Sequence, residues 1–270
     1  VACTTKHFPG GGPQLRGEDA HFPYGREQVY PADRFADHLR PFLAMIAAGT
    51  SAIMPYYGMP VGLAVDGSEV EQVGFGFNAG MVTGLLRETL GFEGVVCTDW
   101  ELVNDNHVGD QVLPARAWGV EHLDPSGRME LILEAGADQF GGEECVELLV
   151  GLVASGRVPE SRLDASVRRL LAVKFQLGLF DNPFVDEEAA GAVVGSAEFV
   201  AEGLRAQAES VTVLTNGLSR GPGQAPLLPL RPGARVYAEG FDVAHSGDGS
   251  EIRSGVFTAV ATPEEADVAI

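Results

Sequence analysis

The segment GFEGVVCTDW, residues 91–100, decides how the rest of the chain is interpreted. Its apolar centre predicts a short buried β-strand, and its two glycines mark the turn before that strand. Asp99 and Trp100 follow at the carboxyl end. An ionised carboxylate is costly in an apolar core, and the active sites of parallel α/β proteins collect at the carboxyl ends of strands. Asp99 is therefore either a functional carboxylate or a cap for the segment that follows.

Strand and helix patterns alternate four times over the first 140 residues. Apolar residues at spacings of three or four predict the helices, and short apolar runs followed by polar residues predict the strands. The expected strands are residues 1–10, 51–57, 95–97 and 136–140, and the expected helices are residues 32–48, 78–90 and 126–135. The alternation predicts parallel βα units in a barrel or an open sheet. Four units are half of a (β/α)8 barrel, so we expect a TIM-type barrel whose N-terminal half is absent from this chain.

The remainder of the chain predicts a second, incomplete domain. Further helices are expected at 143–155, at 164–177 with Asp164 as its cap, and at 197–209, and strands at 211–215, 234–238 and 266–270. The acidic, Gly- and Ala-rich residues 183–196 are typical of a linker, and residues 217–233 of a loop. We therefore assign residues 1–182 to the C-terminal half of a barrel and residues 197–270 to the start of an α/β domain.

Composition excludes some classes of function. The 270 residues are 45% hydrophobic and 21% charged, and no segment is apolar over the ~18 residues that suggest a membrane span. A net charge of -20 argues against nucleic acid or an anionic membrane as partner, because both require clustered Lys and Arg. The three cysteines form no CxxC pair and are expected to be buried thiols. No signal peptide is visible and both ends look internal to a longer protein, so secreted, periplasmic and cytoplasmic locations all stay open.

Lys6 and His7 stand side by side at the end of the first expected strand. Lys6 is one of only two lysines in the chain, against sixteen arginines. It could form a Schiff base in an aldolase-like barrel, hold the hydroxyls of a substrate, or pair with a structural carboxylate. These three roles remain open from the residues alone.

Asp99 beside Trp100 suits glycoside chemistry. A carboxylate can attack an anomeric carbon, and an indole can pack against the apolar face of a sugar ring. Tyr57, at the end of another expected strand, would add a hydroxyl near this nucleophile. A retaining mechanism also needs a second carboxyl group about 5–5.5 Å away as acid and base, and the spacing of the residues does not single it out.

Several segments together resemble glycoside hydrolase family 3, and in particular its bacterial β-glucosidases. KHFPG (6–10), AIMPYYG (52–58), GFEGVVCTDW (91–100) and AGADQF (135–140) occur in the order seen in that family. Residues 162–184 resemble the stretch that leaves the family's barrel, and residues 209–216 with 227–230 resemble the start of its α/β sandwich domain. The resemblance covers about residues 1–240.

The resemblance implies a retaining, exo-acting β-glycosidase that removes terminal, non-reducing β-linked glucose from an oligosaccharide or β-glucoside. Asp99 would be the nucleophile and Trp100 would wall the subsite at the cleaved bond. Lys6 and His7 would hold sugar hydroxyls, and Tyr57 matches the tyrosine near the nucleophile. Neither a metal nor an organic cofactor would be needed.

The acid/base residue is where the chain departs from this pattern. In two-domain β-glucosidases it is a Glu of the second domain, expected here beyond Ile270, so the chain by itself is expected to be inactive. The β-N-acetylglucosaminidases of the family instead use an Asp-x-His pair after KH[FI]PG. Asp19-Ala20-His21 has that form but lies two residues farther along than usual, so it could be an acid/base dyad, a loop-ordering pair or a substrate contact.

Other functions remain as alternatives. Within the family they are β-N-acetylglucosaminidase and β-xylosidase. Outside these activities they are a non-catalytic carbohydrate-binding relative and the Schiff-base aldolase that uses Lys6.

Overall fold

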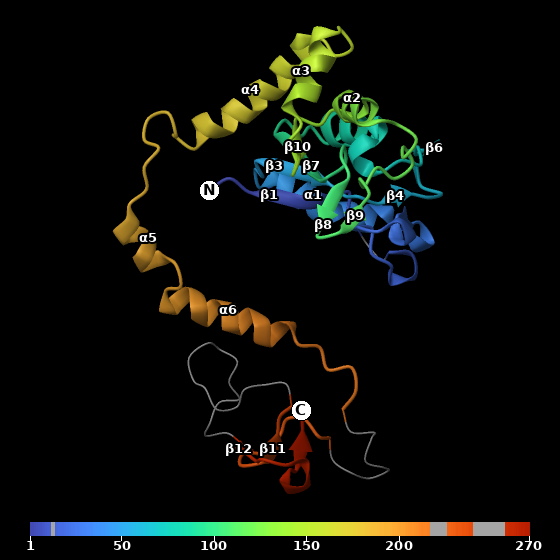
Figure 1. Cartoon of the computed structure of the whole chain (residues 1–270). Helices are drawn as coiled ribbons and strands as arrows, with labels where there is room; N and C mark the ends of the chain where they lie inside the picture. The colour runs from blue at the N-terminus through green and yellow to red at the C-terminus, as the bar shows by residue number, and fades with distance from the viewer. Residues whose placement is uncertain (12–13, 217–225, 240–256) are drawn as a thin grey trace. The chain divides into compact units, whose positions relative to one another are not determined.

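The computed structural model describes residues 1–11, 14–216, 226–239 and 257–270. These residues form two compact units, Val1–Phe184 and Val185–Ile270, and each is treated by itself (Figure 1). The first unit contains every candidate site residue named from the sequence. None of the helices in the described residues is long and apolar enough to cross a bilayer.

A four-stranded parallel sheet organises the first unit. It comprises β1 (Thr4–Phe8), β3 (Ala52–Pro55), β7 (Val95–Trp100) and β10 (Gln139–Gly141), paired in chain order. Lys6 is paired with Met54, Ile53 with Val96, and Gln139 with Cys97. The expected strand at 136–140 is thus shifted towards Gly141, and all four strands are parallel as predicted. Because parallel strands end at the same edge, the polar residues that follow them are brought together.

Helices connect the strands as the apolar periodicity predicted. They are α1 (Phe35–Ala47), η5 (Gly80–Thr89) and α2 (Pro125–Ala135) between strands, then α3 (Val146–Ala154) and α4 (Glu160–Gln176). The Asp124 carboxylate caps α2, and Gly136 ends it with a left-handed φ of 109°. Two details differ from expectation. The segment η5 is a π-helix, and α4 begins after Pro159 rather than at Asp164, which lies within the helix.

The loops contain further short elements. Two-residue strands pair as β2 (Glu27–Gln28) with β4 (Met59–Pro60) and β5 (Ala64–Val65) with β6 (Ser68–Glu69). Residues 101–114 include a hairpin of β8 (Asn106–Val108) and β9 (Gln111–Leu113). Single helical turns are η1 (Leu15–Gly17), η2 (Pro23–Gly25), η3 (Pro31–Asp33), η4 (Phe75–Phe77) and, in the second unit, η6 (Pro263–Glu265).

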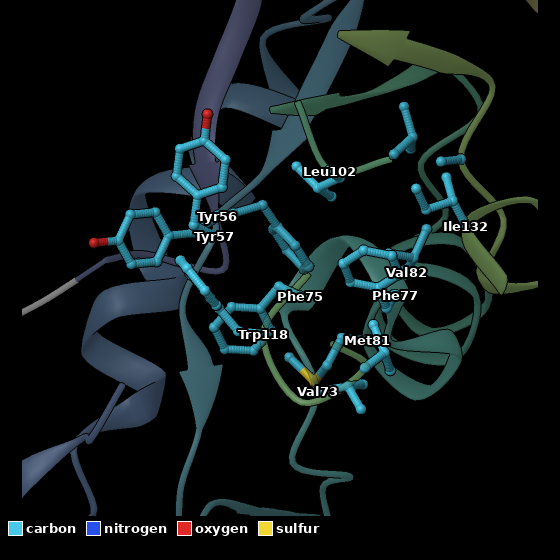
Figure 2. Close-up of a cluster of buried hydrophobic side chains, with 14 of the residues drawn as sticks. Tyr56, Tyr57, Val73, Phe75, Phe77, Met81, Val82, Leu102, Trp118 and Ile132 are labelled. Carbon is cyan, nitrogen blue, oxygen red and sulfur yellow. The ribbon is translucent and has the colours of Figure 1, made fainter. Parts of the chain in front are cut away.

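The core of the first unit contains many aromatic side chains. Phe75, Phe77 and Trp118 are fully buried in it together with side chains of η5 and α2. Figure 2 shows Tyr56 and Tyr57 at the margin of this cluster, with their hydroxyl groups directed away from it. The apolar packing therefore fixes both rings and leaves the hydroxyl groups available for polar contacts.

A buried polar network surrounds Asp138, directly before the start of β10. The Asp138 side chain is fully buried and accepts hydrogen bonds from Arg87 (2.6 Å), Arg169 (2.7 Å) and Ser166 (2.8 Å). It also accepts one from the main-chain N–H of Val96, at 2.9 Å. Because Arg169 and Ser166 belong to α4, this carboxylate attaches that helix to the sheet.

The second unit is a smaller α/β assembly. It contains α5 (Glu187–Val193), α6 (Ala197–Ser210) and a parallel sheet of β12 (Thr258–Ala259), β11 (Arg235–Tyr237) and β13 (Val268–Ala269). The expected linker 183–196 contains α5, which the Asp186 carboxylate caps. Residues 211–215 are not a strand, and they are exposed with no partner strand in the described part of the chain. Part of the expected loop 217–233, residues 217–225, lies outside the described residues.

Candidate active site

The carboxyl ends of β1, β3 and β7 bring four predicted residues together: His7, Tyr57, Asp99 and Trp100, called here the strand-end site. His7 Nε2 lies 3.4 Å from Asp99 Oδ2. The Tyr57 hydroxyl donates a 2.9 Å hydrogen bond to the main-chain carbonyl of Trp100. These contacts join residues up to 92 positions apart in the sequence, and they arise because the parallel strands end at one edge.

Asp99 is the buried carboxylate of this site. The residue is 8% exposed, and its Oδ1 accepts a 2.9 Å hydrogen bond from the Trp100 main-chain N–H. This bond orients the carboxylate, so that Oδ2 faces His7. Asp99 therefore does not cap a helix, which was the alternative role considered from the sequence.

His7 is held mainly in its neutral form near pH 7. Burial lowers the pKa of the imidazole, nearby Lys6 and His21 act in the same direction, and Asp99 opposes them. A neutral imidazole has one N–H donor and one acceptor nitrogen, so it can exchange hydrogen bonds with hydroxyl groups. Lys6, next to it, is exposed, and among the described residues no carboxylate forms an ion pair with it.

Tyr57 remains a hydrogen-bond donor at all physiological pH values. Burial raises the pKa of its hydroxyl, and the negative charge of Asp99 raises it further. Tyr56, beside it, has a pKa raised to about 12, first by burial and then by the charges of Asp19 and Asp99. The Tyr56 hydroxyl accepts a hydrogen bond from Gln14, and its ring meets His7 edge-on at 5.8 Å.

The Asp19–His21 pair lies beside the strand-end site. Asp19 Oδ1 is 2.7 Å from His21 Nδ1 and 3.0 Å from the His21 main-chain nitrogen. These hydrogen bonds, the main-chain one first, lower the pKa of Asp19. An ionised carboxylate only accepts, so His21 Nδ1–H is the donor and Nε2 is left for other contacts. The His21 ring meets Tyr57 edge-on, with 4.8 Å between ring centroids.

The Trp100 side chain packs on two glycines, Gly141 and Gly142, which were not predicted as part of the site. Its indole is half-exposed and packs on the backbone of Gly141 and Gly142, where an added Cβ at either position would overlap the ring. The two adjacent glycines at the end of β10 were the available signal, because glycine allows close approach of another group to the backbone. One face of the indole is thereby covered, and the side chain remains half accessible to solvent.

The ion pair of Arg116 with Glu101, next to Trp100 in the chain, was also not predicted from the sequence. Arg116 is 8% exposed, and its guanidinium pairs with the Glu101 carboxylate directly after Trp100. The signal was an arginine within the otherwise apolar stretch LPARAWGV, 113–120, because a buried arginine requires an acceptor.

The cysteines and the possible metal ligands give no second site in the part of the chain that the structure describes. Cys97 and Cys145 are partly buried, whereas Cys3 is exposed, which corrects the expectation of three buried thiols. Burial and then Asp99 raise the pKa of Cys97 to about 11, so this thiol is a poor nucleophile at neutral pH. Among the described residues, no group of three or more His, Cys, Asp or Glu side chains is placed to hold a metal ion.

Comparison with known proteins identifies the family. A model described as the N-terminal domain of glycosyl hydrolase family 3 matches residues 1–173. The chain therefore belongs to glycosyl hydrolase family 3. This agrees with the resemblance of the KHFPG and GFEGVVCTDW segments.

Individual relatives are β-glucosidases. The probable β-glucosidase C of Aspergillus flavus is 52% identical over 270 residues, covering 100% of this chain and 40% of that protein. The periplasmic β-glucosidase/β-xylosidase of Dickeya chrysanthemi is 37% identical, again covering 100% of this chain and 40% of the relative. A solved β-glucosidase of Erythrobacter marinus aligns with a TM-score of 0.64 and 26% identity, over 88% of this chain and 28% of that one. The chain thus spans about 40% of the length of these curated relatives.

Proposed function

We propose that the protein is a retaining β-glucosidase, with Asp99 as its nucleophile. The observation that carries the proposal is the buried Asp99 carboxylate at the carboxyl end of β7, 3.4 Å from the neutral imidazole of His7. The 52% identity of this whole chain to part of the probable β-glucosidase C of Aspergillus flavus supports glucose as the sugar. The substrate is a terminal β-linked glucoside.

The proposed reaction has two displacement steps. Asp99 attacks the anomeric carbon, the bond to the leaving-group oxygen breaks, and that oxygen takes a proton from a general acid. Water then attacks the same carbon and loses its proton to that group, now a base, as the Asp99–sugar bond breaks. Glucose leaves with its anomeric configuration retained. Neither step draws on a metal or an organic cofactor.

The other residues of the strand-end site bind and orient the sugar. His7 and the exposed Lys6 would hold sugar hydroxyls, and Trp100 would pack against the ring face at the cleaved bond. Tyr57 would keep the backbone after Asp99 in place, since its hydroxyl bonds the Trp100 carbonyl. A pre-positioned nucleophile lowers the barrier because its orientation is not lost again in the reaction.

We also propose that the first unit is half of a (β/α)8 barrel. Four parallel strands in chain order, each followed by a helix, support this architecture. The Aspergillus flavus relative is about two and a half times as long as the chain, because the chain covers 40% of it, which leaves room for further strands. Residues 197–270 would begin an α/β sandwich domain.

Two candidates exist for the acid/base group. One is a Glu of a second domain beyond Ile270, as the family resemblance implies, in which case the chain alone lacks turnover. The other is the Asp19–His21 pair, favoured by the 4.8 Å separation of the His21 and Tyr57 rings. Turnover by His21→Gln in the full protein separates them. An acid/base role predicts a large loss of kcat/KM with a poor leaving group and little loss of kcat/KM with 2,4-dinitrophenyl glucoside, whose first displacement needs no acid.

The central test is covalent trapping in the full protein. A 2-deoxy-2-fluoro-β-glucoside with a dinitrophenyl leaving group forms a long-lived glycosyl-enzyme, and peptide mass spectrometry locates the label. The proposal expects the label on Asp99 and none in Asp99→Asn. Labelling of another carboxylate would contradict it. Sugar binding without labelling or hydrolysis would instead favour a non-catalytic carbohydrate-binding protein, and borohydride trapping on Lys6 would favour an aldolase.

The sugar itself is tested by comparing aryl glycosides. Aryl β-glucoside should be hydrolysed with a higher kcat/KM than aryl β-xyloside or aryl N-acetyl-β-glucosaminide. The Dickeya chrysanthemi relative is named for both glucoside and xyloside, so the xyloside is the closest competitor. A preference for the N-acetyl substrate would assign the protein to the branch with the Asp-x-His pair.

A further inference from the structure

One short segment, residues 116–118, contacts both halves of the candidate active site. Arg116 reaches the residue that follows Trp100, and Trp118 reaches the loop that carries Asp19 and His21. Neither residue belongs to the strand-end site, and no role was assigned to this segment from the sequence. Tyr57 contacts both of these regions, because its hydroxyl bonds the Trp100 carbonyl and its ring packs against His21.

The first contact holds the chain just after Asp99 and Trp100. The Arg116 guanidinium pairs with the Glu101 carboxylate, and the Arg116 main-chain N–H donates to the Glu101 carbonyl at 3.0 Å. Glu101 has a left-handed φ of 60°, which a non-glycine residue adopts only when its surroundings hold it there. Its own N–H donates to the Gly141 carbonyl at 3.1 Å. The strand end is thus held from both main chain and side chain.

The Arg116 side chain pairs with this carboxylate and with no other among the residues that the structure describes. It is nearly fully buried, and its Nε–H finds no acceptor among the residues that the structure describes. A buried charge that loses its partner is strongly destabilising, so the pair is maintained in the folded protein. The guanidinium is also close enough to Tyr57 to counter, in part, the rise of its hydroxyl pKa that burial and Asp99 cause.

The second contact holds the loop of the Asp19–His21 pair. The buried indole of Trp118 donates from Nε1 to the carbonyl of Ala20, at 2.8 Å. Ala20 lies between Asp19 and His21, so this bond fixes the centre of the pair. The Trp118 carbonyl in turn accepts from the Gly74 N–H at 2.8 Å, which ties the segment to the core.

We propose that residues 116–118 are a brace that positions the two sides of the active site, Arg116 acting on Asp99 through Glu101 and Trp118 acting on His21 through Ala20. This inference rests on the proposed glycosidase function. Both are positioning residues, because each acts through another residue. The brace sets where the nucleophile stands relative to the His21 loop, and a displacement of about 1 Å at a reacting group can cost ~100-fold in rate.

The two contacts predict separable defects in the full protein. Arg116→Met should slow labelling of Asp99 by the dinitrophenyl 2-fluoroglucoside by roughly 10- to 100-fold, with the inhibition constant of glucose changed less than about threefold. Trp118→Phe removes one hydrogen bond to the loop and should leave that labelling rate within about threefold, while KM for an aryl glucoside rises about fivefold. Arg116→Lys should restore part of the labelling rate, because it keeps the charge.

Two controls separate positioning from general loss of stability. Arg157→Met removes an exposed pair with Glu130 and should change neither rate. If Arg116→Met does not fold, Glu101→Gln removes the same pair and carries the same prediction. The brace is wrong if the Arg116 variants label Asp99 at the wild-type rate, or if both Arg116→Met and Trp118→Phe lower every constant in parallel.

A readout without catalysis keeps this inference distinct from the proposed function. Asp99 acts to raise the pKa of His7, so a displaced Asp99 should lower the His7 titration midpoint in the Arg116 variants. NMR of the imidazole measures this midpoint. Absence of any label on wild-type Asp99 would reject the proposed function. An unchanged His7 midpoint in Arg116→Met would reject the brace.

Discussion

The Tyr57 hydroxyl donates a 2.9 Å hydrogen bond to the Trp100 carbonyl, so a side chain that follows β3 holds the backbone next to Asp99 on β7. Tyr57→Phe removes this bond and little else. We expect the free energy of unfolding to fall by about 1 kcal/mol and kcat to fall by roughly fivefold or more. Urea denaturation and steady-state kinetics measure the two effects. The matched control is Tyr24→Phe, because the Tyr24 ring is exposed. Equal effects of the two substitutions would show that the Tyr57 hydroxyl has no role in the site.

His7 provides a test of the charge at the strand-end site. Burial first, then Lys6 and His21, lower its pKa below the ordinary 6.5, and Asp99 raises it. Asp99→Asn should therefore shift the His7 midpoint further down, as measured by NMR titration. The remote Asp66→Asn is the control and should leave it unchanged. An upward shift in Asp99→Asn would contradict the contact between these two residues.

The lowered pKa of His7 also predicts how the stability of the fold changes with pH. The unfolded chain binds the His7 proton more readily than the folded protein does. The contribution of His7 to stability is thus complete above pH 6.5 and is lost as the pH falls through its folded pKa. Replacing His7 by Gln should flatten this part of the stability profile, measured by urea denaturation at a series of pH values below 6.5. A profile identical to wild type would assign the acid sensitivity to other groups.

Gly142 supports the Trp100 indole. Gly142→Ala would place a methyl group against the ring at a left-handed φ of 67°, so the indole must move. We expect a higher KM for glucosides and an altered fluorescence spectrum of the half-exposed Trp100. Gly156→Ala is the matched control, because Gly156 has a φ of 77° with open space around it. Gly156→Ala introduces the strain of a left-handed φ without a contact with another side chain. An equal effect of both substitutions on KM would therefore show that Trp100 is not displaced in Gly142→Ala.

Asp138 stabilises the fold without taking part in the chemistry. Asp138→Asn removes the negative charge that pairs with Arg87 and Arg169 in a fully buried position. We expect the free energy of unfolding to fall by about 3–5 kcal/mol, because a buried charge loses its partner. Molecules that remain folded at low temperature should keep their kcat. Asp164→Asn changes an exposed carboxylate on α4, the helix that carries Arg169, and should have little effect. A comparable loss there would contradict the role of the network.

Much of the fold was predictable from the chain because the signals are local. Apolar runs ending in His7, Tyr57 and Asp99 predicted parallel strands with polar residues at one edge, and the periodicity over 32–48 predicted α1. The π-helical hydrogen bonding of η5 and the helix α5 within the expected linker were not predictable in this way. The expected strand 211–215 failed because a strand needs a partner, and a local pattern does not supply one.

The candidate site was likewise predictable from the sequence only where the signals are local. Residue types and their order were enough to select Asp99, Trp100, His7, Lys6 and Tyr57 as candidates, because a strand pattern directs its end residues to a shared edge. The tertiary structure alone decided that His21 lies against Tyr57, that Trp100 rests on Gly141 and Gly142, and that Arg116 holds Glu101. Each of these contacts joins separate segments of the chain. Short-range periodicity carries no information on which distant side chains meet, since packing of the whole unit sets those distances.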